Sequence, residues 1–361
     1  MTELEAVLLV GGKGTRLRPL TLSAPKPMLP AAGVPFLTHQ LARARAAGVT
    51  HCVLATSYKA EVFEEYFGDG SALGLELDYV TETQALGTGG GIRNVAGLLR
   101  SAPDEPVIIF NGDVLSGHDI TAQVERHRKT DAAVTLYLTT VDDPRAFGCV
   151  PIDGEGRVTA FLEKDPNPVT NLINAGCYIF RRSVIDEIPA DRVVSVERET
   201  FPALLAAGER VQSYLDGTYW LDLGTPSAFV RGSCDLVMGL APSPAVPGTT
   251  GASLCLPGSQ VDPTARLAGG TVIGARARVG AAAVVDGSVV FDDAVIEPGA
   301  LVRDSVVGCG ARVGAGSVLV GVVLGDGADI GSGNELLAGV RVFPGAALAD
   351  GAVRFSTDVT S

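Results

Sequence analysis

The last third of the chain repeats itself at a fixed interval, and this repeat restricts the possible folds more than any other feature. Between residues 271 and 336 similar segments recur, with apolar side chains at steps of six, six and five in each unit. A period near six is typical of a triangular coil, with one short strand on each side and one apolar side chain pointing inward from each strand. The inward positions are Ile273, Val279, Val285, Val290, Ile296, Val302, Val307, Val313, Leu319, Leu324, Ile330 and Leu336. The repeat therefore predicts a hexapeptide-type β-helix.

The composition of this region argues for a structural role. Residues 251–361 contain 20 of the 45 glycines but no lysine, histidine, tryptophan or tyrosine. Many hexapeptide β-helices are acyltransferases that use a histidine base, and this chain has no histidine after His127. We therefore expect the β-helix to pack against the rest of the chain and against a second subunit, which would also cover its ends and make the protein a homo-oligomer.

A proline-rich segment, APSPAVPGTTG, precedes the repeat at 241–251 and is typical of a linker. With 361 residues, the chain is long enough for two domains that each bury a core. We expect a first domain at 1–240, a linker at 241–251 and the β-helix at 252–361.

Strands and helices alternate in the first part of the chain. The patterns predict strands at 6–10, 49–56, 75–81 and 107–110, and helices at 35–47, 59–67, 87–99 and 119–129. Such alternation indicates a mostly parallel sheet covered on both faces, with ligands outside the carboxyl ends of the strands. Because residues 11–16 and 111–113 both follow predicted strands, one cleft can hold them together. From 132 onward the pattern becomes richer in strands, at 133–139, 157–163, 172–180 and 211–215, with helices at 197–207 and 225–240.

The stretch AVLLVGGKGTRLRPLTLSAPKPMLP at 6–30 combines a buried strand with a glycine-rich loop. Glycines let backbone N–H groups turn toward phosphate oxygens, and Arg16 and Lys26 would add positive charge. Residues 6–60 contain no Asp or Glu although the whole chain has a net charge of −13, so this region indicates an anion site. The loop matches neither the Walker A pattern nor the dinucleotide G-x-G-x-x-G pattern. A plain glycine turn with solvated basic residues remains the alternative.

Composition excludes several other functions. A sequence pI of about 4.8 argues against nucleic acid as a partner but is compatible with a nucleotide in a locally basic cleft. The apolar runs are far too short for a bilayer span and no leader-like segment precedes residue 6, so we expect no membrane partner and a cytoplasmic protein. The six cysteines form no C-x-x-C pair and are expected to be reduced, buried thiols.

Two carboxylates stand in short motifs outside the repeat. Asp113 follows a predicted buried strand in NGD, and Asp222 lies in YWLDLGTP at 219–226. Taken singly, Asp113 is also typical of a turn or a helix cap, and Asp222 of a turn that enters a helix. Two carboxylates from distant segments meeting at one Mg²⁺ would explain both, because hard oxygen ligands suit this ion. From the residues alone, both interpretations stay open.

A set of motifs that covers almost the whole chain resembles the sugar-1-phosphate nucleotidyltransferases. The motifs are GGKGTRLRPLT and PKPMLP, LGTGG from 86, NGDV from 111, FLEK from 161, NAG from 174 and YWLDLGTP from 219. The stretch SVERETFP at 195–202 is typical of a helix start capped by Ser195, and it also resembles the GDP-mannose pyrophosphorylases in particular. With the repeat, the chain looks most like mannose-1-phosphate guanylyltransferases of the actinobacterial type. This resemblance implies an α/β fold: a Rossmann-like, mostly parallel sheet followed by a left-handed hexapeptide-type β-helix.

The resemblance also assigns roles to single residues. It implies nucleotide binding by Gly11, Gly12, Gly14, Thr15, Arg16, Lys26, Glu82, Gly87 and Thr88. It implies sugar-phosphate binding by Gly112, Glu163, Lys164, Asn174 and Gly176, and metal binding by Asp113 and Asp222. Arg16, Lys26, Asp113 and Asp222 are then the catalytic residues. The chain departs from the family pattern at Gly89, where alanine is usual, and at Asp165, where proline is usual. Without the family, the pair Glu163 and Lys164 would be read as surface charge.

The reaction implied by the resemblance is transfer of GMP from GTP to α-D-mannose 1-phosphate, with Mg²⁺, to give GDP-mannose and pyrophosphate. Such a transfer needs positioning and charge neutralisation more than a strong base. One alternative keeps the reaction but uses glucose or heptose 1-phosphate with dTTP, UTP or ATP. Another is a non-catalytic regulatory subunit that binds nucleotide sugars. Such subunits usually lose a metal carboxylate or a loop cation, whereas this chain retains Arg16, Lys26, Asp113, Lys164 and Asp222.

Overall fold

The computed structural model describes residues 4–57, 59–163, 166–248 and 251–355. By packing, the chain divides into two compact units, residues 1–12 with 40–220 and residues 13–39 with 221–361. The segment 13–39 and the residues after 220 therefore group with the β-helix. The boundary expected at 241–251 stays a prediction about independent folding, and residues 249 and 250 of that linker lie outside the described residues.

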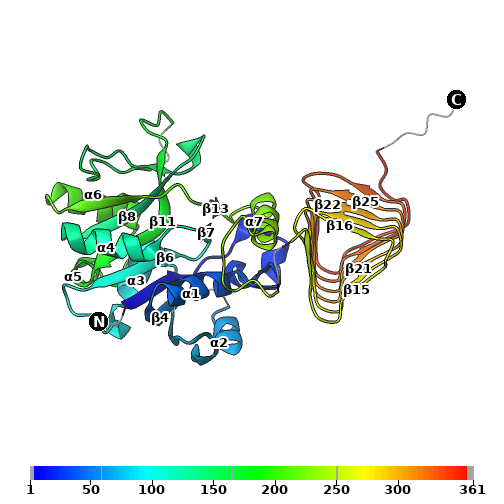
Figure 1. The fold of residues 1–361 in the computed structure, drawn as a ribbon, viewed down its shortest axis with the longest axis horizontal. Helices are drawn as coiled ribbons and strands as arrows, with labels where there is room; N and C mark the ends of the chain where they lie inside the picture. Colours follow the sequence, from blue (N-terminus) through cyan, green and yellow to red (C-terminus); the bar gives the residue numbers. More distant parts are fainter. Residues whose placement is uncertain (1–3, 58, 164–165, 249–250, 356–361) are drawn as a thin grey trace. The chain divides into compact units, whose positions relative to one another are not determined.

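The first unit is built on a nine-stranded mixed sheet (Figure 1). Its strands are β1 (Leu4–Leu9), β4 (Val49–Thr56), β5 (Glu76–Thr81), β6 (Pro106–Asn111), β8 (Val134–Thr140), β9 (Gly148–Cys149), β10 (Leu162–Glu163), β11 (Leu172–Arg181) and β12 (Val211–Leu215). The path β10-β9-β11-β6-β1-β4-β5 runs across the sheet, and β8 pairs with both β11 and β12. The strands β6, β1, β4 and β5 are parallel, whereas β11 is antiparallel to β6 and to β8. The expected mostly parallel sheet is confirmed for the first half of this unit.

Helices bury both faces of this sheet. They are α1 (Phe36–Ala46), α2 (Glu61–Phe67), α3 (Gly87–Asn94), α4 (Ile120–Thr130), α5 (Arg182–Glu187), the π-helix η7 (Val196–Thr200) and α6 (Phe201–Ala206). On one face, Val7, Ile109 and Phe180 pack with Ile92 of α3 and Phe201 of α6. On the other face, α4 packs against β8 and β11. The expected strand at 157–163 is mostly absent from the described residues, where only β10 and isolated bridges at Arg157 and Val158 form.

The second unit contains three parallel sheets, which form the three sides of a triangular β-helix (Figure 1). The first is β14 (Ser253–Cys255), β17 (Thr271–Ile273), β20 (Val289–Val290), β23 (Val306–Val307), β26 (Val323–Leu324) and β29 (Arg341–Val342). The second is β15 (Gln260–Val261), β18 (Arg278–Val279), β21 (Val295–Ile296), β24 (Arg312–Val313), β27 (Asp329–Ile330) and β30 (Ala347–Leu348). The third is β16 (Arg266–Ala268), β19 (Val284–Asp286), β22 (Leu301–Arg303), β25 (Val318–Val320) and β28 (Glu335–Leu336). The β-helix predicted from the repeat is confirmed.

The core and register of the β-helix follow the repeat closely. Every apolar position predicted to point inward is buried in one continuous core. In the central coils each strand pairs with the equivalent strand of the next repeat, so that Val272 lies opposite Val289. The coils at both ends are slightly longer, since Ser253 lies opposite Thr271 and Val323 opposite Arg341. The longer end coils explain why the sequence repeat is regular only over its middle.

One face of the β-helix is covered by other parts of its own unit. Helix α7 (Pro226–Met238) packs on β14, β17 and β20, and on the short hairpin of β2 (Pro30–Ala31) and β3 (Val34–Pro35). The rings of Phe229 and Phe291 meet edge to face, with centroids 6.4 Å apart. A Cβ at Gly270 would lie 2.4 Å from the carbonyl oxygen of Cys234, so this approach requires glycine.

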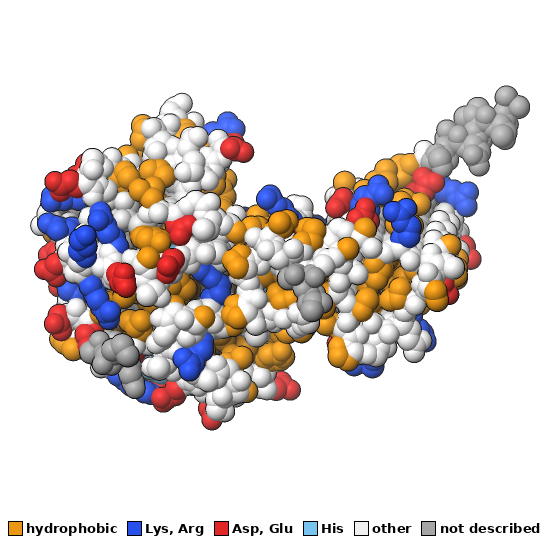
Figure 2. Space-filling model, in the orientation of Figure 1, with side chains coloured by type: hydrophobic (Ala, Val, Ile, Leu, Met, Phe, Trp, Pro, Cys, Tyr) orange, Lys and Arg blue, Asp and Glu red, His pale blue; other side chains and the backbone are white. Residues whose placement is uncertain are grey.

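In the described part of the chain, every helix is too short or too polar to cross a bilayer. Figure 2 shows acidic and basic side chains interspersed on the visible face of the mixed-sheet unit. Apolar side chains also reach the surface, among them Leu337 and Phe343 near the end of the β-helix.

Candidate active site

The carboxyl ends of β1 and β6 bring two predicted motifs together. These strands are parallel neighbours with Leu9 opposite Asn111, so that the chain leaves both at the same edge of the sheet. The N–H of Gly112 donates to the carbonyl oxygen of Leu9 at 3.0 Å. A Cβ at Gly112 would lie 2.5 Å from the same oxygen, and only glycine allows this contact. Of the segments 11–16 and 111–113 that were expected together, Gly11 and Gly12 follow β1 at the same edge as Gly112 and Asp113, whereas residues 13–16 belong to the second compact unit.

The third parallel strand, β4, fixes the path of the glycine loop. The N–H of Val10 donates to the carbonyl of Ala55 at 3.1 Å, and the N–H of Gly12 donates to Ser57 Oγ at 3.2 Å. Gly12 has a φ of +119°, a conformation that side chains other than hydrogen rarely allow. Gly11 and Gly12 are both exposed, so this turn presents its backbone at the surface of the sheet edge.

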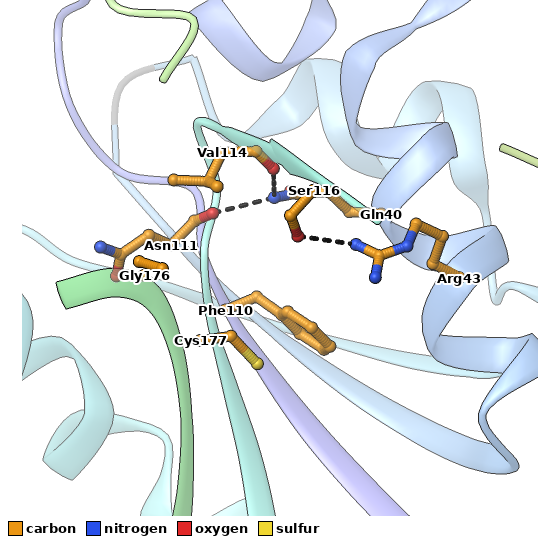
Figure 3. Close-up of a pocket in the computed structure, with 9 residues that line it drawn as sticks. Gln40, Arg43, Phe110, Asn111, Val114, Ser116, Gly176 and Cys177 are labelled. Atoms are coloured by element: carbon orange, nitrogen blue, oxygen red, sulfur yellow. Dashed lines mark hydrogen bonds between the residues drawn. The ribbon is translucent and has the colours of Figure 1, made fainter. Parts of the chain in front are cut away.

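A buried glutamine holds the loop that carries Asp113 (Figure 3). The Nε2 group of Gln40 donates to the carbonyl of Asn111 at 2.8 Å and to the carbonyl of Val114 at 3.0 Å. These two carbonyls bracket Gly112 and Asp113. Gln40 therefore fixes both ends of the NGD turn, while Asp113 itself is partly exposed.

The predicted sugar-contact motif NAG lies against the same turn. Gly176 has a φ of +78°, and a Cβ there would come 3.1 Å from Asn111 Nδ2 and 3.0 Å from Val114 Cγ2. Asn174 Nδ2 donates to the hydroxyl of Tyr178 at 2.8 Å, and burial raises the pKa of Tyr178 well above its ordinary value. The register of β11 shifts between Asn174 and Tyr178, which turns this segment out of the regular ladder. Asn174, Gly176 and the NGD turn therefore form one cluster.

A small cavity of about 10 Å³ lies beneath this cluster, between α1 and strands β6, β7 (Val114–Ser116) and β11. Figure 3 shows Arg43 reaching it from α1, where its guanidinium donates to Ser116 Oγ at 2.9 Å. Arg43 also donates to the carbonyl of His118 at 2.8 Å. Burial lowers the pKa of Arg43. These bonds make Arg43 a support for the strand that follows Asp113.

The predicted nucleotide-binding loop at 86–89 is held by residues 194–197, at the start of the SVERETFP segment. The N–H of Gly89 donates to the carbonyl of Val194 at 2.8 Å, and a Cβ at Gly87 would lie 2.6 Å from the same oxygen. The Thr88 hydroxyl donates to Glu197 Oε2 at 2.9 Å and accepts from the N–H of Val196 at 3.0 Å. Thr88 is therefore anchored by its side chain.

Glu82 and Ser195 complete this loop. The N–H of Leu86 donates to Glu82 Oε2 at 3.3 Å, and burial raises the pKa of Glu82. Ser195 Oγ donates to Glu197 Oε2 at 2.7 Å and accepts from the N–H of Arg198 at 3.2 Å. The cap predicted at Ser195 is confirmed, although the turn it caps is π-helical.

Five of the predicted residues belong to the second compact unit, where they form their own cluster. Gly14 has a φ of +54°, and a Cβ there would lie 3.1 Å from Lys26 Cβ. A Cβ at Gly224 would lie 2.6 Å from Asp222 Oδ1 and 2.8 Å from Arg16 Nη2. Arg16 and Asp222 are therefore close neighbours across Gly224, although they stand far apart in the sequence. The members of this cluster are Gly14, Thr15, Arg16, Lys26 and Asp222.

The FLEK motif is only partly described. Strand β10 pairs Glu163 with Gly148 of β9, and β9 in turn pairs with β11, the strand that contains NAG. Lys164 lies outside the described residues.

Within the described ranges, no group of three or more His, Cys, Asp or Glu side chains is arranged to hold a metal ion. An ion such as Mg²⁺ does not require such a group, because it takes one or two protein carboxylates and fills its other positions with water and substrate phosphates. Asp113 and Asp222, both partly exposed carboxylates, are suitable donors of this kind.

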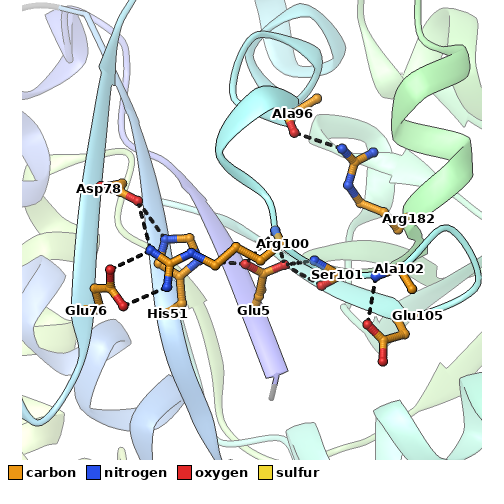
Figure 4. A network of polar contacts seen from close by, with 10 residues as sticks. All are labelled: Glu5, His51, Glu76, Asp78, Ala96, Arg100, Ser101, Ala102, Glu105 and Arg182. Atoms are coloured by element: carbon orange, nitrogen blue, oxygen red, sulfur yellow. Dashed lines mark hydrogen bonds and ion pairs between the residues drawn. The ribbon is translucent and has the colours of Figure 1, made fainter. Parts of the chain in front are cut away.

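A second polar cluster lies at the opposite, amino-terminal edge of the sheet (Figure 4). The buried carboxylate of Glu5 accepts from His51 Nδ1 at 2.6 Å and from the N–H of Ser101 at 2.7 Å. Burial by itself raises the pKa of Glu5, but hydrogen bonds from His51, Ser101 and the backbone outweigh it and lower the pKa to about 2. The same hydrogen bond to Glu5 raises the pKa of His51. Arg100 joins the cluster by a bidentate contact with Glu76.

Several supporting residues were missed by sequence reasoning. Ser57 and Glu197 hydrogen-bond the predicted residues Gly12 and Thr88. Gln40 and Arg43 hydrogen-bond the chain on either side of the NGD turn or just after it. A signal existed only for Gln40 and Arg43, which are polar residues beside the apolar stripe of Leu37, Leu41 and Ala44. None could be assigned a partner without the fold.

Comparison with known families places these features in context. Residues 5–238 match the nucleotidyl transferase family model, and residues 249–353 match the model of the GMPPB C-terminal domain. The mannose-1-phosphate guanylyltransferase of Mycobacterium tuberculosis is 61% identical over 99% of both chains. Mannose-1-phosphate guanylyltransferase 1 of Arabidopsis thaliana is 33% identical over 83% of both chains.

Solved structures agree with the first of these matches. HddC from Yersinia pseudotuberculosis is 28% identical with a TM-score of 0.56, over 64% of this chain and 98% of the other. The same protein complexed with GMP-PN gives a TM-score of 0.55 over the same shares of the two chains. The matched models, the full-length relative and the glycine turns at the carboxyl edge of the sheet lead to one conclusion: the chain belongs to the nucleotidyl transferase family, with full-length likeness to its mannose-1-phosphate guanylyltransferases.

Proposed function

We propose that this protein transfers GMP from GTP to α-D-mannose 1-phosphate and releases pyrophosphate. The main support is the cluster at the carboxyl edge of the sheet, where the turn after β1, the NGD turn and the NAG segment meet. The choice of substrates is supported by the likeness of the whole chain to a mannose-1-phosphate guanylyltransferase.

The geometry suits in-line transfer between two phosphates. A phosphate oxygen of mannose 1-phosphate attacks the α-phosphorus of GTP, the bond from that phosphorus to the bridging oxygen breaks, and pyrophosphate leaves. The attacking oxygen is already ionised, so no side chain has to remove a proton. The chain's part is to hold both phosphates and neutralise their charge.

We assign the phosphate contacts to the glycine turn and to Arg16 and Lys26. The exposed turn at Gly11 and Gly12 lets phosphate oxygens approach the backbone, where the N–H of Gly11 can donate to them, while the N–H of Gly12 donates to Ser57 Oγ and holds the turn. Gly14 and Thr15 continue this turn, and Glu82, Gly87 and Thr88 would contact the base. Arg16 and Lys26 would neutralise charge on the triphosphate as pyrophosphate departs.

The sugar phosphate would bind on the NGD and NAG side. Gly112, Asn174 and Gly176 line this side, and Glu163 and Lys164 of the FLEK motif would add a hydroxyl acceptor and a cation. Asp113 and Asp222 would hold Mg²⁺, which when bound supplies positive charge between the phosphates. We place the reaction in the cytoplasm, without nucleic acid or membrane as a partner.

The test is pyrophosphate release with Mg²⁺ across GTP, ATP, UTP and dTTP combined with mannose, glucose and heptose 1-phosphates. We expect strong signal for GTP with mannose 1-phosphate and at least tenfold less for the other pairs, since a wrong base leaves polar groups unpaired. Selectivity for another pair would replace the substrates but keep the mechanism. Silence from folded protein that still binds GDP-mannose would support a regulatory subunit instead.

We also propose that the chain forms a homo-oligomer through the β-helix. Leu337 is 42% exposed and Phe343 is 53% exposed near its last coils, and such side chains favour a covered surface. Sedimentation of full-length protein should give a multimer, and Phe343→Asp should lower its mass. A monomeric wild-type protein would contradict this role.

A further inference from the structure

We infer that Arg341, on the last strand of the first β-helix sheet, positions the loop that carries Arg16 and thereby makes the β-helix part of the nucleotide site. Arg341 begins β29, and its Nη1 donates to the carbonyl of Arg16 at 2.9 Å and to the carbonyl of Arg18 at 2.8 Å. All three residues belong to the second compact unit. The inference rests on the proposed role of Arg16 at the triphosphate.

These two bonds fix a short turn from its outer side. Residues Thr15–Leu17 form one turn of 3-10 helix, in which the N–H of Leu17 donates to the carbonyl of Gly14 at 3.0 Å. Leu17 is fully buried, so the turn is anchored inward by its side chain. Arg341 binds the carbonyls of Arg16 and Arg18, the residues on either side of Leu17, so that it holds the Arg16–Leu17 peptide and the peptide that follows Arg18.

The side chain of Arg16 is located by a separate contact. Its Nη2 lies where a Cβ at Gly224 would approach to 2.8 Å, next to Asp222. The guanidinium of Arg16 is thus placed at the LGTP turn, while its main chain is held by Arg341. A shift of about 1 Å in a group that stabilises transition-state charge can lower the rate on the order of a hundredfold, so a bond to the backbone of Arg16 bears on catalysis.

Arg341 differs from other arginines of the β-helix in its partners. Arg276 binds Asp293, Arg303 binds Asp286, and Arg312 binds Glu297 and Asp329, all within the coil itself. Those pairs are exposed, and exposed pairs add little stability. Arg341 instead donates to carbonyls of a segment near the start of the chain. Its contacts therefore join the β-helix to the loop, whereas the contacts of the other three arginines stay within the β-helix.

The segment 13–39 has other contacts in the same unit, at positions away from the loop. A Cβ at Gly33 would lie 2.7 Å from Leu256 Cδ2 of the β-helix, and the N–H of Ala32 donates to Ser233 Oγ of α7 at 2.8 Å. These contacts hold the hairpin that follows the loop. Arg341 contacts the loop itself, between the glycine turn and Lys26.

The test compares Arg341→Ala with Arg278→Ala in the full-length protein. Arg278 is an exposed arginine at the corresponding place of a β-strand on another sheet, so it controls for loss of a surface arginine from a coil. We expect Arg341→Ala to raise the KM for GTP or lower kcat so that kcat/KM for GTP falls at least about tenfold. The KM for mannose 1-phosphate should change less than about twofold, because that substrate binds elsewhere. Arg341→Lys, which can still reach a carbonyl, should recover part of the loss.

Amide hydrogen exchange gives a readout that does not depend on the reaction. Exchange at Leu17 and Arg18 should be faster in Arg341→Ala than in the wild type and unchanged in Arg278→Ala. If wild-type protein shows no activity with GTP and mannose 1-phosphate, the proposed function fails, and the exchange comparison still decides whether Arg341 orders the loop. Unchanged exchange in Arg341→Ala would overturn the inference. Faster exchange with unaltered kcat/KM for GTP would also overturn it, because the contact would then order the loop without serving the site.

Discussion

The two edges of the mixed sheet carry polar clusters of opposite design. At the amino-terminal edge, the Glu5 carboxylate accepts hydrogen bonds from His51 and from the backbone and side chain of Ser101, and it is 3% exposed (Figure 4). At the carboxyl-terminal edge, Gln40 fixes the NGD turn by donating to two backbone carbonyls (Figure 3). Asp113, within this turn, is partly exposed.

The difference separates a structural network from a site. At the amino-terminal edge the polar atoms face one another, so that the network stabilises the fold and has little left to offer a ligand. At the carboxyl-terminal edge Gln40 donates to backbone carbonyls on both sides of the NGD turn, and the glycine turn at Gly11 and Gly12 is exposed. Its charged residues alone would have made the Glu5 cluster the more attractive candidate for a functional site. Its place at the amino ends of the strands and the hydrogen bonds that its members already make with one another argue against that choice.

The largest effect expected is on turnover. Asp113→Asn should lower kcat at least about a thousandfold, because it removes a negative charge proposed to hold Mg²⁺ while keeping the shape of the side chain. The control is Asp104→Asn, an exposed aspartate just before the start of β6, at the opposite end of the strand from Asp113, which should leave kcat unchanged. Steady-state pyrophosphate release and circular dichroism give the two readouts. Near-normal turnover in Asp113→Asn would remove this residue from the metal site.

The second-largest effect is expected on the free energy of unfolding, from a change to Glu5 at the amino-terminal edge of the sheet. Glu5→Gln should lower the free energy of unfolding by about 3 kcal/mol, since it leaves donors of His51 and Ser101 poorly matched in a buried place. Turnover at saturating substrate should be unchanged. Urea unfolding and kcat of the same preparation would check both, and a large loss of kcat with unaltered stability would reverse the contrast between the edges.

The pH dependence of this variant sharpens the same point. The pKa of Glu5 is lowered from 4.5 to about 2 in the fold, so its contribution to stability is present above pH 4.5 and is lost as the pH falls toward 2. Wild-type protein should therefore lose stability over this range by more than Glu5→Gln does. Equal acid slopes for the two proteins would show that Glu5 is not held as a carboxylate.

A smaller effect is expected for Gln40, which supports the site without reaching it. Gln40→Leu removes two bonds to the carbonyls of Asn111 and Val114 and should lower kcat about tenfold. Gln212→Leu is a matched control, because Gln212 Nε2 likewise donates to two carbonyls, of Glu155 and Gly156. Both variants should lose about 1 to 2 kcal/mol of stability, but only Gln40→Leu should lose activity. Equal kcat in the two would make Gln40 a purely structural residue.

Much of the fold could be predicted because its local signals are strong. The predicted strand at 49–56 matches β4 to the residue, and the inward positions of the β-helix were all identified from their spacing. The strand expected at 157–163 was wrong over most of its length because propensity does not show which segments find a pairing partner. The grouping of 13–39 and α7 with the β-helix also had no local signal, since it depends on contacts such as Gly270 with Cys234.

The site was predictable where chemistry follows a strand end and not where it depends on support. Gly12, Gly112 and Asp113 follow parallel strands, so topology alone brings their turns to one edge. Gln40 and Glu197 act through bonds to residues 71 and 109 positions away, and no pattern in their own neighbourhood announces such a partner. The resemblance named Thr88 as a ligand contact, and only the structure shows that its hydroxyl is already used.

The bond from Arg341 to the loop at Arg16 sets a limit on how the β-helix can vary in length. Neighbouring strands along a coil stack lie about 4.8 Å apart. Adding or deleting one coil between β14 and β29 would therefore carry the guanidinium about 5 Å along the stack, beyond hydrogen-bond reach of the two carbonyls. Coils added after β30 would carry no such cost. The number of coils before Arg341 therefore determines whether its guanidinium can reach the two carbonyls. We expect insertions that preserve function only after β30.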